Sequence, residues 1–419
     1  MLATVISISN LLMGISILLI GSGFLGTLLG VRAGLEGFSG TVIGIVMSSY
    51  FVGFVLGAFI CPNIIRRVGH IRDFAIMAAA ACASSLGHGL IIDPVAWVVL
   101  RIITGISVLG LYLVTESWLN DQAPSHSRGR LFATYMSVTL VALAVSQFLL
   151  LVYGADGEAP FILAGIFLSL ALIPVAMTRR PEPTPVPVPT VGVAHLFQVS
   201  PSGVVGATAS GLVNGAFWGV GAVFAHDVGL SSLNISLFMS ATILGGALLQ
   251  FPIGHLSDFR DRRLVVMVVC GLSAVAALAV FLAAHAAPWL LILCGAVYGG
   301  FSFSVYALSV AHTNDHLNAG EALEATQGLL LMNGIGASVG PVTVGLLMES
   351  FGAEALPLFF AVVLGGLGFY TLHRSRVAPA VPAEEQVEFV PMARTSPVAL
   401  EMDPRAETEP ELELEVPEG

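Results

Sequence analysis

Twelve long apolar stretches dominate the sequence and restrict the chain to one class of fold. A helix needs about 20 apolar residues to cross the hydrocarbon core of a bilayer. The stretches lie at residues 8–30, 41–65, 74–92, 95–115, 131–153, 160–177, 202–224, 233–253, 264–284, 288–311, 325–347 and 354–372. Only 10% of the 419 residues are charged, where about 25% is usual in soluble domains. The sequence therefore predicts an all-α membrane protein with twelve transmembrane helices in a lipid bilayer.

The basic residues are distributed very unevenly between the predicted loops. All 16 of them are arginines. Twelve follow the second, fourth, sixth, eighth and twelfth stretches, whereas the loops on the other face contain only Arg32. Positive residues concentrate in the cytoplasmic loops of membrane proteins. We therefore expect both termini to lie in the cytoplasm.

Acidic residues concentrate in one segment near the C-terminus. The formal net charge is −11, and residues 378–419 account for most of it with eleven acidic residues and two arginines. This segment is rich in proline and poor in aromatic residues, a composition typical of disorder. We expect residues 376–419 to form a disordered acidic cytoplasmic tail. The chain has no basic patch, so a nucleic-acid partner is not expected.

The two halves of the chain resemble each other at a constant offset of 192 residues. Ser39, Ile43, Met47 and Ser48 match Ser231, Ile235, Met239 and Ser240, and Trp97 matches Trp289. The proline-rich segment 179–200 is expected to be an extended cytoplasmic linker. We predict a monomer with two six-helix bundles, residues 1–178 and 201–375. Two parallel six-helix repeats with a site at their interface suit a transporter that works by alternating access.

Polar side chains within the predicted membrane helices are candidate solute contacts, because polar groups are costly in lipid. The candidates for a cavity wall are Arg101, Tyr112, Gln147, Asn214, Trp218, Gln250, Tyr298, Tyr306 and Asn333. Arg101 is the only basic residue well inside a predicted helix. It either orients an anion or tunes a proton site, or it bonds the backbone carbonyls of the first helix. For the other candidates, the alternative role is hydrogen bonding between helices.

Glu116 is the most deeply embedded acidic residue by position. It follows the apolar run of the fourth stretch and precedes Ser117 and Trp118. A carboxyl group partly removed from water is suited to reversible protonation, so one hypothesis gives Glu116 a role in proton coupling. The other hypothesis places it in a cytoplasmic gate, where it would pair with Arg67 or Arg72.

Two patterns that elsewhere indicate bound ligands lack the required context. Residues 21–26 spell GxGxxG, but they lie inside a predicted membrane helix with no preceding strand, so they do not predict a nucleotide site. His312 and His316 flank Asp315 without a further clustered ligand, which is too few residues for a metal site. We expect no metal, no cofactor and no catalytic residues. Because the chain has no ATP-binding motif, a gradient must supply the energy for any transport.

The segment after the eighth stretch carries a family resemblance. Residues 254–263 read GHLSDFRDRR and resemble the G-x-L-x-D-R-x-G-R-R signature of the major facilitator superfamily, with departures at Phe259 and Asp261. The matching loop of the first half has Pro62 and Arg66 where the family has Gly and Asp. The resemblance implies a cytoplasmic gate that contains Arg67, Gly69, Gly254, Asp258, Arg262 and Arg263.

Further motifs narrow the resemblance. Residues 101–105, RIITG, resemble the R-x-x-x-G element of the same superfamily. Residues 116–120, ESWLN, followed by RGR at 128–130, resemble the YcaD-like branch of bacterial permeases. The glycine-proline motif that family antiporters often carry on the fifth helix is missing, and a similar run at Gly336, Gly340, Pro341 and Gly345 lies in the eleventh stretch instead.

The sequence thus predicts a secondary transporter, a proton-driven symporter for a small organic solute in the bacterial inner membrane. Two alternatives remain. The first is an antiporter that expels drugs or metabolites in exchange for protons. The second is a membrane sensor that transports nothing and signals through its acidic tail.

Overall fold

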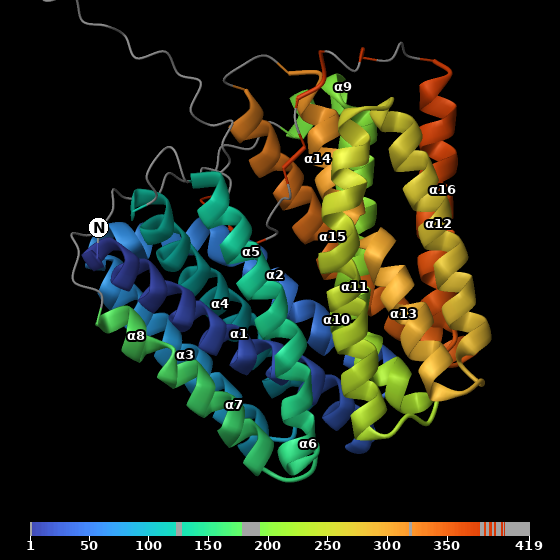
Figure 1. The fold of residues 1–419 in the computed structure, drawn as a ribbon. Coiled ribbons are helices and arrows are strands. Elements are labelled where there is room, and N and C mark those ends of the chain that lie inside the picture. The colour runs from blue at the N-terminus through green and yellow to red at the C-terminus, as the bar shows by residue number, and fades with distance from the viewer. Residues whose placement is uncertain are drawn as a thin grey trace, which may run out of the picture.

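The computed structural model describes residues 2–122, 128–177, 193–317, 321–377, 381–382, 385–387, 389–390, 395–396 and 398, and within them it contains helices and no strand (Figure 1). The first half contains α1 (Leu2–Leu35), α2 (Gly40–Val68), α3 (His70–Leu90), α4 (Pro94–Gln122), α5 (Arg128–Ser146), the 3₁₀ turn η2 (Gln147–Leu149), α6 (Leu150–Tyr153), α7 (Ala159–Leu170) and α8 (Leu172–Ala176). The second half contains α9 (Val193–Val199), α10 (Pro201–Asp227), α11 (Ser232–Asp258), α12 (Arg262–Ala283), α13 (Pro288–Ser302), α14 (Ser304–Asn314), α15 (Ala322–Phe351) and α16 (Ala355–Ser375). The predicted all-α architecture is confirmed.

Eleven helical segments in the described residues are long and apolar enough to cross a membrane. Three of them are continuous runs of shorter elements, namely α5 to α6, α7 to α8, and α13 to α14. The stretch expected at 74–92 forms α3, whose 21 residues include two histidines, two serines and Asp73. These side chains reduce its hydropathy, so α3 is not among the eleven. The count of twelve spans therefore stays a prediction.

The sequence repeat corresponds to a repeat of local structure. Ser39 caps the N-terminus of α2 by accepting a hydrogen bond from the backbone N–H of Val42. Ser231, its partner at the offset of 192, caps α11 by accepting from Asn234. A serine side chain at this position satisfies a backbone N–H that has no partner inside the helix. Equivalent helices in the two halves thus begin with the same serine N-cap.

Small residues determine how neighbouring helices pack. A Cβ atom on Gly53 of α2 would collide with the backbone oxygen of Ile102 on α4. In the second half, a Cβ on Gly245 of α11 would collide in the same way with Ala296 on α13. Glycine lets helix backbones approach closely, and here the matching glycines hold matching helix pairs together.

The two halves contact each other at one end of the molecule, which we call the closed end. There α2 and α15 meet: the backbone N–H of Thr41 donates to Glu349 at 2.8 Å, and that of Val342 donates to Ser48 Oγ at 3.1 Å. In Figure 1 the bundles approach each other in the lower middle of the view and separate toward the top. We call this opposite end, where α2, α4 and α11 end and α12 begins, the open end.

The bundle boundaries stay predictions, because part of the evidence for them lies outside the described residues. Most of the linker expected at 179–200 falls in 178–192, which the structure does not describe. Residues 193–199 of that linker form α9. Ten residues of the expected tail between 381 and 398 are described.

Candidate functional site

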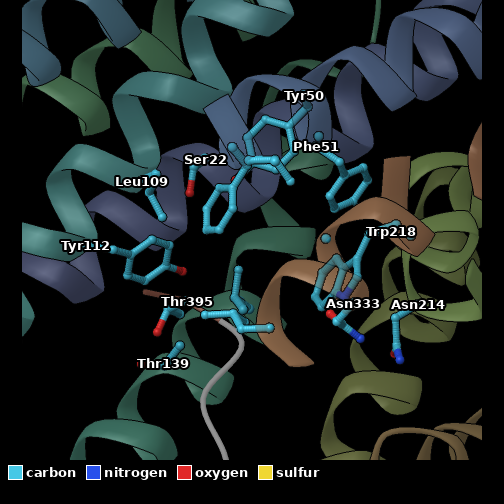
Figure 2. A pocket seen from close by; sticks show the side chains of 18 of the residues that line it. Ser22, Tyr50, Phe51, Leu109, Tyr112, Thr139, Asn214, Trp218, Asn333 and Thr395 are labelled. Atoms are coloured by element: carbon cyan, nitrogen blue, oxygen red, sulfur yellow. The ribbon is translucent and has the colours of Figure 1, made fainter. Parts of the chain in front are cut away.

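A cavity of about 270 Å³ lies between the two halves. Its wall takes residues from α1, α2, α4 and α5 of the first half and from α10, α11 and α15 of the second, together with Phe303 between α13 and α14. Figure 2 shows Tyr112 and Trp218 on opposite sides of it, with Tyr50 and Phe51 above and Asn333 beside Trp218. The lining extends from the middle of the helices toward the open end, where Thr395 of the tail contributes. The cavity thus lies where two six-helix repeats place a shared site.

Among the described residues of the cavity wall, Arg101 is the only charged one. Its guanidinium carbon lies 4.5 Å from the ring centroid of Tyr50, a cation–π contact,. The residue is 4% exposed, and its Nε has no hydrogen-bond partner among the described residues. No carboxylate within the described part of the chain lies at ion-pair distance from it. A buried cation without an anionic partner is costly, and the cavity beside Arg101 has room for one.

Amide and aromatic groups form the opposite wall. Asn214 donates to the backbone oxygen of Ser210 at 2.7 Å, while its buried Oδ1 has no partner in the described residues. Asn333 donates to the backbone oxygen of Ala207 at 3.1 Å. Trp218 stacks near Phe303, with ring centroids 6.4 Å apart. This side of the cavity therefore combines a flat apolar surface with an unpaired hydrogen-bond acceptor.

Six of the nine residues predicted for the cavity wall line it, namely Arg101, Tyr112, Asn214, Trp218, Gln250 and Asn333. Gln147 does not: its Oε1 accepts a 2.5 Å hydrogen bond from Thr27, which does line the cavity. Tyr298 stacks on Phe360 with centroids 4.8 Å apart and so faces α16. Tyr306 is buried in α14 outside the lining.

The aromatic side chains of α2 were not among the predicted site residues. Tyr50, Phe51, Phe54 and Phe59 all line the cavity. In an apolar helix such residues do not differ in pattern from those that face lipid or pack in the core. What distinguishes Tyr50 is its position next to a close contact between helices. It lies three residues before Gly53, in the segment of α2 that packs closely on α4 near Arg101.

Glu116 lies deeper than the cavity wall and is fully buried. Its carboxylate accepts hydrogen bonds from the hydroxyl groups of Tyr135, Thr395 and Ser396. Arg67, its predicted partner in a gate, is exposed in this conformation, and so is Arg72. The structure therefore brings Glu116 together with the tail instead of with the arginines that follow α2.

A buried charge cluster occupies the open end of the second half. Arg262, 1% exposed, donates to Asp258 at 2.9 Å and to Asp315 at 2.6 Å. Burial raises the pKa of the Asp315 carboxyl above its ordinary value, although Arg262 beside it acts in the opposite direction,. All three residues belong to the second half, so this cluster is formed while the two halves are apart at the open end.

Of the remaining predicted gate residues, Arg263 and Gly254 lie near this cluster. Arg263 pairs with Asp261 at 3.1 Å. Burial by itself raises the pKa of the Asp261 carboxyl, but the hydrogen bonds and charge of Arg263 outweigh it and hold that pKa below its ordinary value. Gly254 packs directly against the ring of Phe389. In the first half, Gly69 has a φ of 87° and forms the turn between α2 and α3.

Comparison with known proteins agrees with this architecture. The family model described as Major Facilitator Superfamily matches residues 3–201 and 203–402. A relative from Escherichia coli, described as the uncharacterized MFS-type transporter YcaD, is 29% identical over 357 residues, covering 84% of this chain and 92% of the relative. This confirms the resemblance seen in the sequence motifs.

Solved structures share the fold. The crystal structure of the nucleoside transporter NupG superposes with a TM-score of 0.72 at 16% identity, covering 88% of this chain and 98% of that one. A bacterial homologue of the human lysosomal transporter Spinster, in an inward-facing and occupied conformation, gives a TM-score of 0.70 at 15% identity, covering 91% and 97%. The chain is a membrane transporter and not an enzyme, and it belongs to the major facilitator superfamily.

Proposed function

We propose that this protein is a secondary active transporter that moves a small organic solute across the bacterial inner membrane by alternating access. The observation that carries the proposal is the cavity between the two repeats, lined from both halves and shut off by their contacts at the closed end. Rocking of one half against the other would close the open end and expose the cavity at the opposite face.

The open end is proposed to face the cytoplasm, with both termini there. Support comes from the arginines, which concentrate in the segments at this end,. The test uses single cysteines in a background that lacks Cys61, Cys82, Cys270 and Cys294. Glu36→Cys and Glu158→Cys should react with an impermeant thiol reagent added outside intact cells. Pro185→Cys should stay unlabelled, and the opposite pattern would overturn the orientation.

The chemistry of the wall favours an organic acid with an apolar, flat body. Arg101 supplies one positive charge with no carboxylate of the described residues beside it, and charge-assisted hydrogen bonds to a carboxylate or phosphate are among the strongest that a side chain makes,. Tyr50, Phe54, Tyr112 and Trp218 supply apolar surface of the kind that binds ring systems,. No acidic residue belongs to the described lining, so organic cations are disfavoured.

Screening for ligands tests this assignment directly. Purified protein should be stabilised against heat by members of a library of aromatic and aliphatic carboxylates, and far less by their neutral amides. Arg101→Gln should weaken binding of the best acid by about 10- to 100-fold, because a hydrogen bond to a charged group contributes about 1.5–3 kcal/mol. Arg101→Lys keeps the positive charge but loses the planar guanidinium group. Its affinity for the acid should therefore lie between those of the wild type and Arg101→Gln. Equal binding of acid and amide by the wild type would contradict the assignment.

The proton gradient is proposed as the energy source, with Glu116 as the group that carries the proton. Glu116 is a fully buried acidic side chain one helix turn beyond Tyr112 of the cavity wall, toward the open end. Uptake by symport and expulsion by exchange use the same groups, and the direction of solute flow against an imposed pH gradient in proteoliposomes distinguishes them. A chain that only senses would show specific binding but no flux of the bound acid.

A further inference from the structure

Residues of the C-terminal tail lie between the two halves at the open end. Ser396 and Val398 are buried, and Phe389 is 8% exposed. Thr395 belongs to the cavity wall, and Figure 2 shows it near Tyr112 and Thr139. Part of a segment whose composition predicts disorder is therefore buried inside the molecule.

The tail is bound to the second half through its backbone. The N–H of Val387 donates to Asp315 at 3.0 Å, and its carbonyl oxygen accepts from Arg262 at 2.7 Å. The N–H of Phe389 donates to Asp258 at 2.8 Å. These groups add three hydrogen bonds to the charge cluster, in a place where buried charges need polar partners,.

The side chain of Phe389 also contacts the second half. The ring of Phe389 packs on Gly254 so closely that a Cβ atom at position 254 would collide with it. Glycine is therefore required at the position where the ring rests in this conformation. Gly254, Asp258 and Arg262 all belong to the motif at the end of α11 and the start of α12.

The tail is bound to the first half through Glu116. The hydroxyl groups of Thr395 and Ser396 both donate to its carboxylate. Glu116 belongs to the first half, whereas the charge cluster belongs to the second. One segment thereby connects Glu116 of α4 with Asp258 and Arg262 of the second half.

We propose that the open end is a docking site for this chain's own tail, and that the docked tail holds the protein in the conformation that is shut at the closed end. The inference rests on the proposed rocking of the two halves. Closing the open end would bring α4 toward the ends of α11 and α12, into the space that Phe389, Thr395 and Ser396 occupy. The tail must leave this space before the cavity opens on the other face, so its binding competes with the transport cycle.

Disulfide trapping tests the docking itself. In the cysteine-free background, Gly254→Cys with Phe389→Cys should form a disulfide in native membranes treated with copper phenanthroline. The matched control is Leu256→Cys with Phe389→Cys, since Leu256 is on the same helix turn but exposed. The first pair should react at least five times faster than the control pair. Equal rates for both pairs would overturn the docked position.

Distance measurements test the effect on conformation. Spin labels on Asn63→Cys and Phe259→Cys report the width of the open end, and labels on Leu35→Cys and Ser350→Cys report the closed end. Removing residues 378–419, or combining Phe389→Ala, Thr395→Ala and Ser396→Ala, should at least double the fraction of molecules with a narrow open end and a wide closed end. Glu385→Ala changes an exposed residue of the same tail and should leave both distance distributions unchanged.

The outcomes separate this inference from the proposed function. Unchanged distances in the truncated chain, together with flux in proteoliposomes, would overturn the role of the tail and leave the transporter intact. Changed distances without flux of any acid would support the docked tail and count against the proposed solute class. These measurements require no known substrate, so a failed ligand search does not affect them.

Discussion

At the scale of single residues, Glu116 shows how a buried charge depends on its neighbours. It has no arginine beside it among the described residues and relies on three hydroxyl groups instead. Two of these belong to the tail, so release of the tail would leave Tyr135 as the remaining described partner. The hydrogen bonding of the Glu116 carboxylate and the docking of the tail are therefore coupled.

Glu116→Gln tests the proton-carrying role. The amide cannot exchange a proton with the cavity, so uptake driven by a pH gradient should fall at least tenfold. Exchange of labelled substrate between two equal pools needs no net proton movement and should continue at near wild-type rate. Both rates are measured in proteoliposomes with the acid found by screening. Asp121→Asn, an exposed acid near the end of the same helix, is the control and should change neither rate.

A different pattern would identify a gate. If Glu116 pairs with Arg67 when the open end closes, Glu116→Gln should slow uptake and exchange alike. The charge reversal Glu116→Arg with Arg67→Glu should then recover part of both activities. Uptake that keeps its dependence on the pH gradient in Glu116→Gln would remove the residue from proton coupling.

At the scale of helices, close contacts between backbones determine which helix faces pack together, and the periodicity of the side chains indicates this less clearly. The faces of α2 and α11 that pack on their neighbours are marked by Gly53 and Gly245, which occupy equivalent positions in the repeat. Bilayers provide little hydrophobic force between helices, so van der Waals contact at small residues stabilises the packing. Helix pairs α2–α4 and α11–α13 therefore pack through the same kind of close contact in the two halves.

Gly53→Ala should destabilise the first bundle. The added methyl group would overlap the backbone oxygen of Ile102, and overpacking of this kind costs about 1–3 kcal/mol. Thermal unfolding in detergent, followed by tryptophan fluorescence, should show a midpoint several degrees below that of the wild type. Gly34→Ala is the matched control, because a Cβ on Gly34 of α1 meets no atom within 4 Å. An equal change in both variants would mean that helix propensity, and not the close contact, determines the outcome.

At the scale of the whole molecule, the sequence predicted those features that depend on composition and repetition. The apolar stretches predicted the helices, and the offset of 192 predicted a duplicated unit, which is consistent with the equivalent caps found at Ser39 and Ser231. Polar residues such as Arg101 and Asn333 were predictable as cavity residues, because polar side chains are energetically costly in lipid and are usually functional there,.

Other features depend on long-range geometry that periodicity does not contain. The prediction that Tyr298 and Tyr306 both line the cavity assumes one continuous helix, whereas the helix is interrupted at Phe303 between α13 and α14. Tyr298 consequently packs on α16. The tail binds through backbone N–H groups of Val387 and Phe389, which have no signature in the sequence, and through single side chains such as Ser396 that follow no periodic pattern.

The equilibrium between the two ends depends on hydrogen bonds that cross from one half to the other. On one side of the closed end, the hydroxyl of Ser240 donates to the backbone oxygen of Ala144 at 2.6 Å, and that of Ser236 donates to Gln147 at 2.8 Å. Both serines lie on α11 and both acceptors on the other half, so these bonds exist only while the closed end is shut. A bond present in one conformation alone biases the equilibrium by its full contribution.

Combining Ser236→Ala with Ser240→Ala should shift the protein toward the conformation that is open at this end. Each hydrogen bond contributes about 1 kcal/mol, so losing both changes the equilibrium by roughly 2 kcal/mol, or about 30-fold. The measurement is the rate at which Ser22→Cys, in the cavity wall, reacts with an impermeant thiol reagent supplied at the face of the closed end. Ser273→Ala is the control, since that buried hydroxyl donates to Val269 within its own helix and crosses no interface. The double variant should react much faster than the control; equal rates would show that the contacts of α2 with α15 alone keep this end shut.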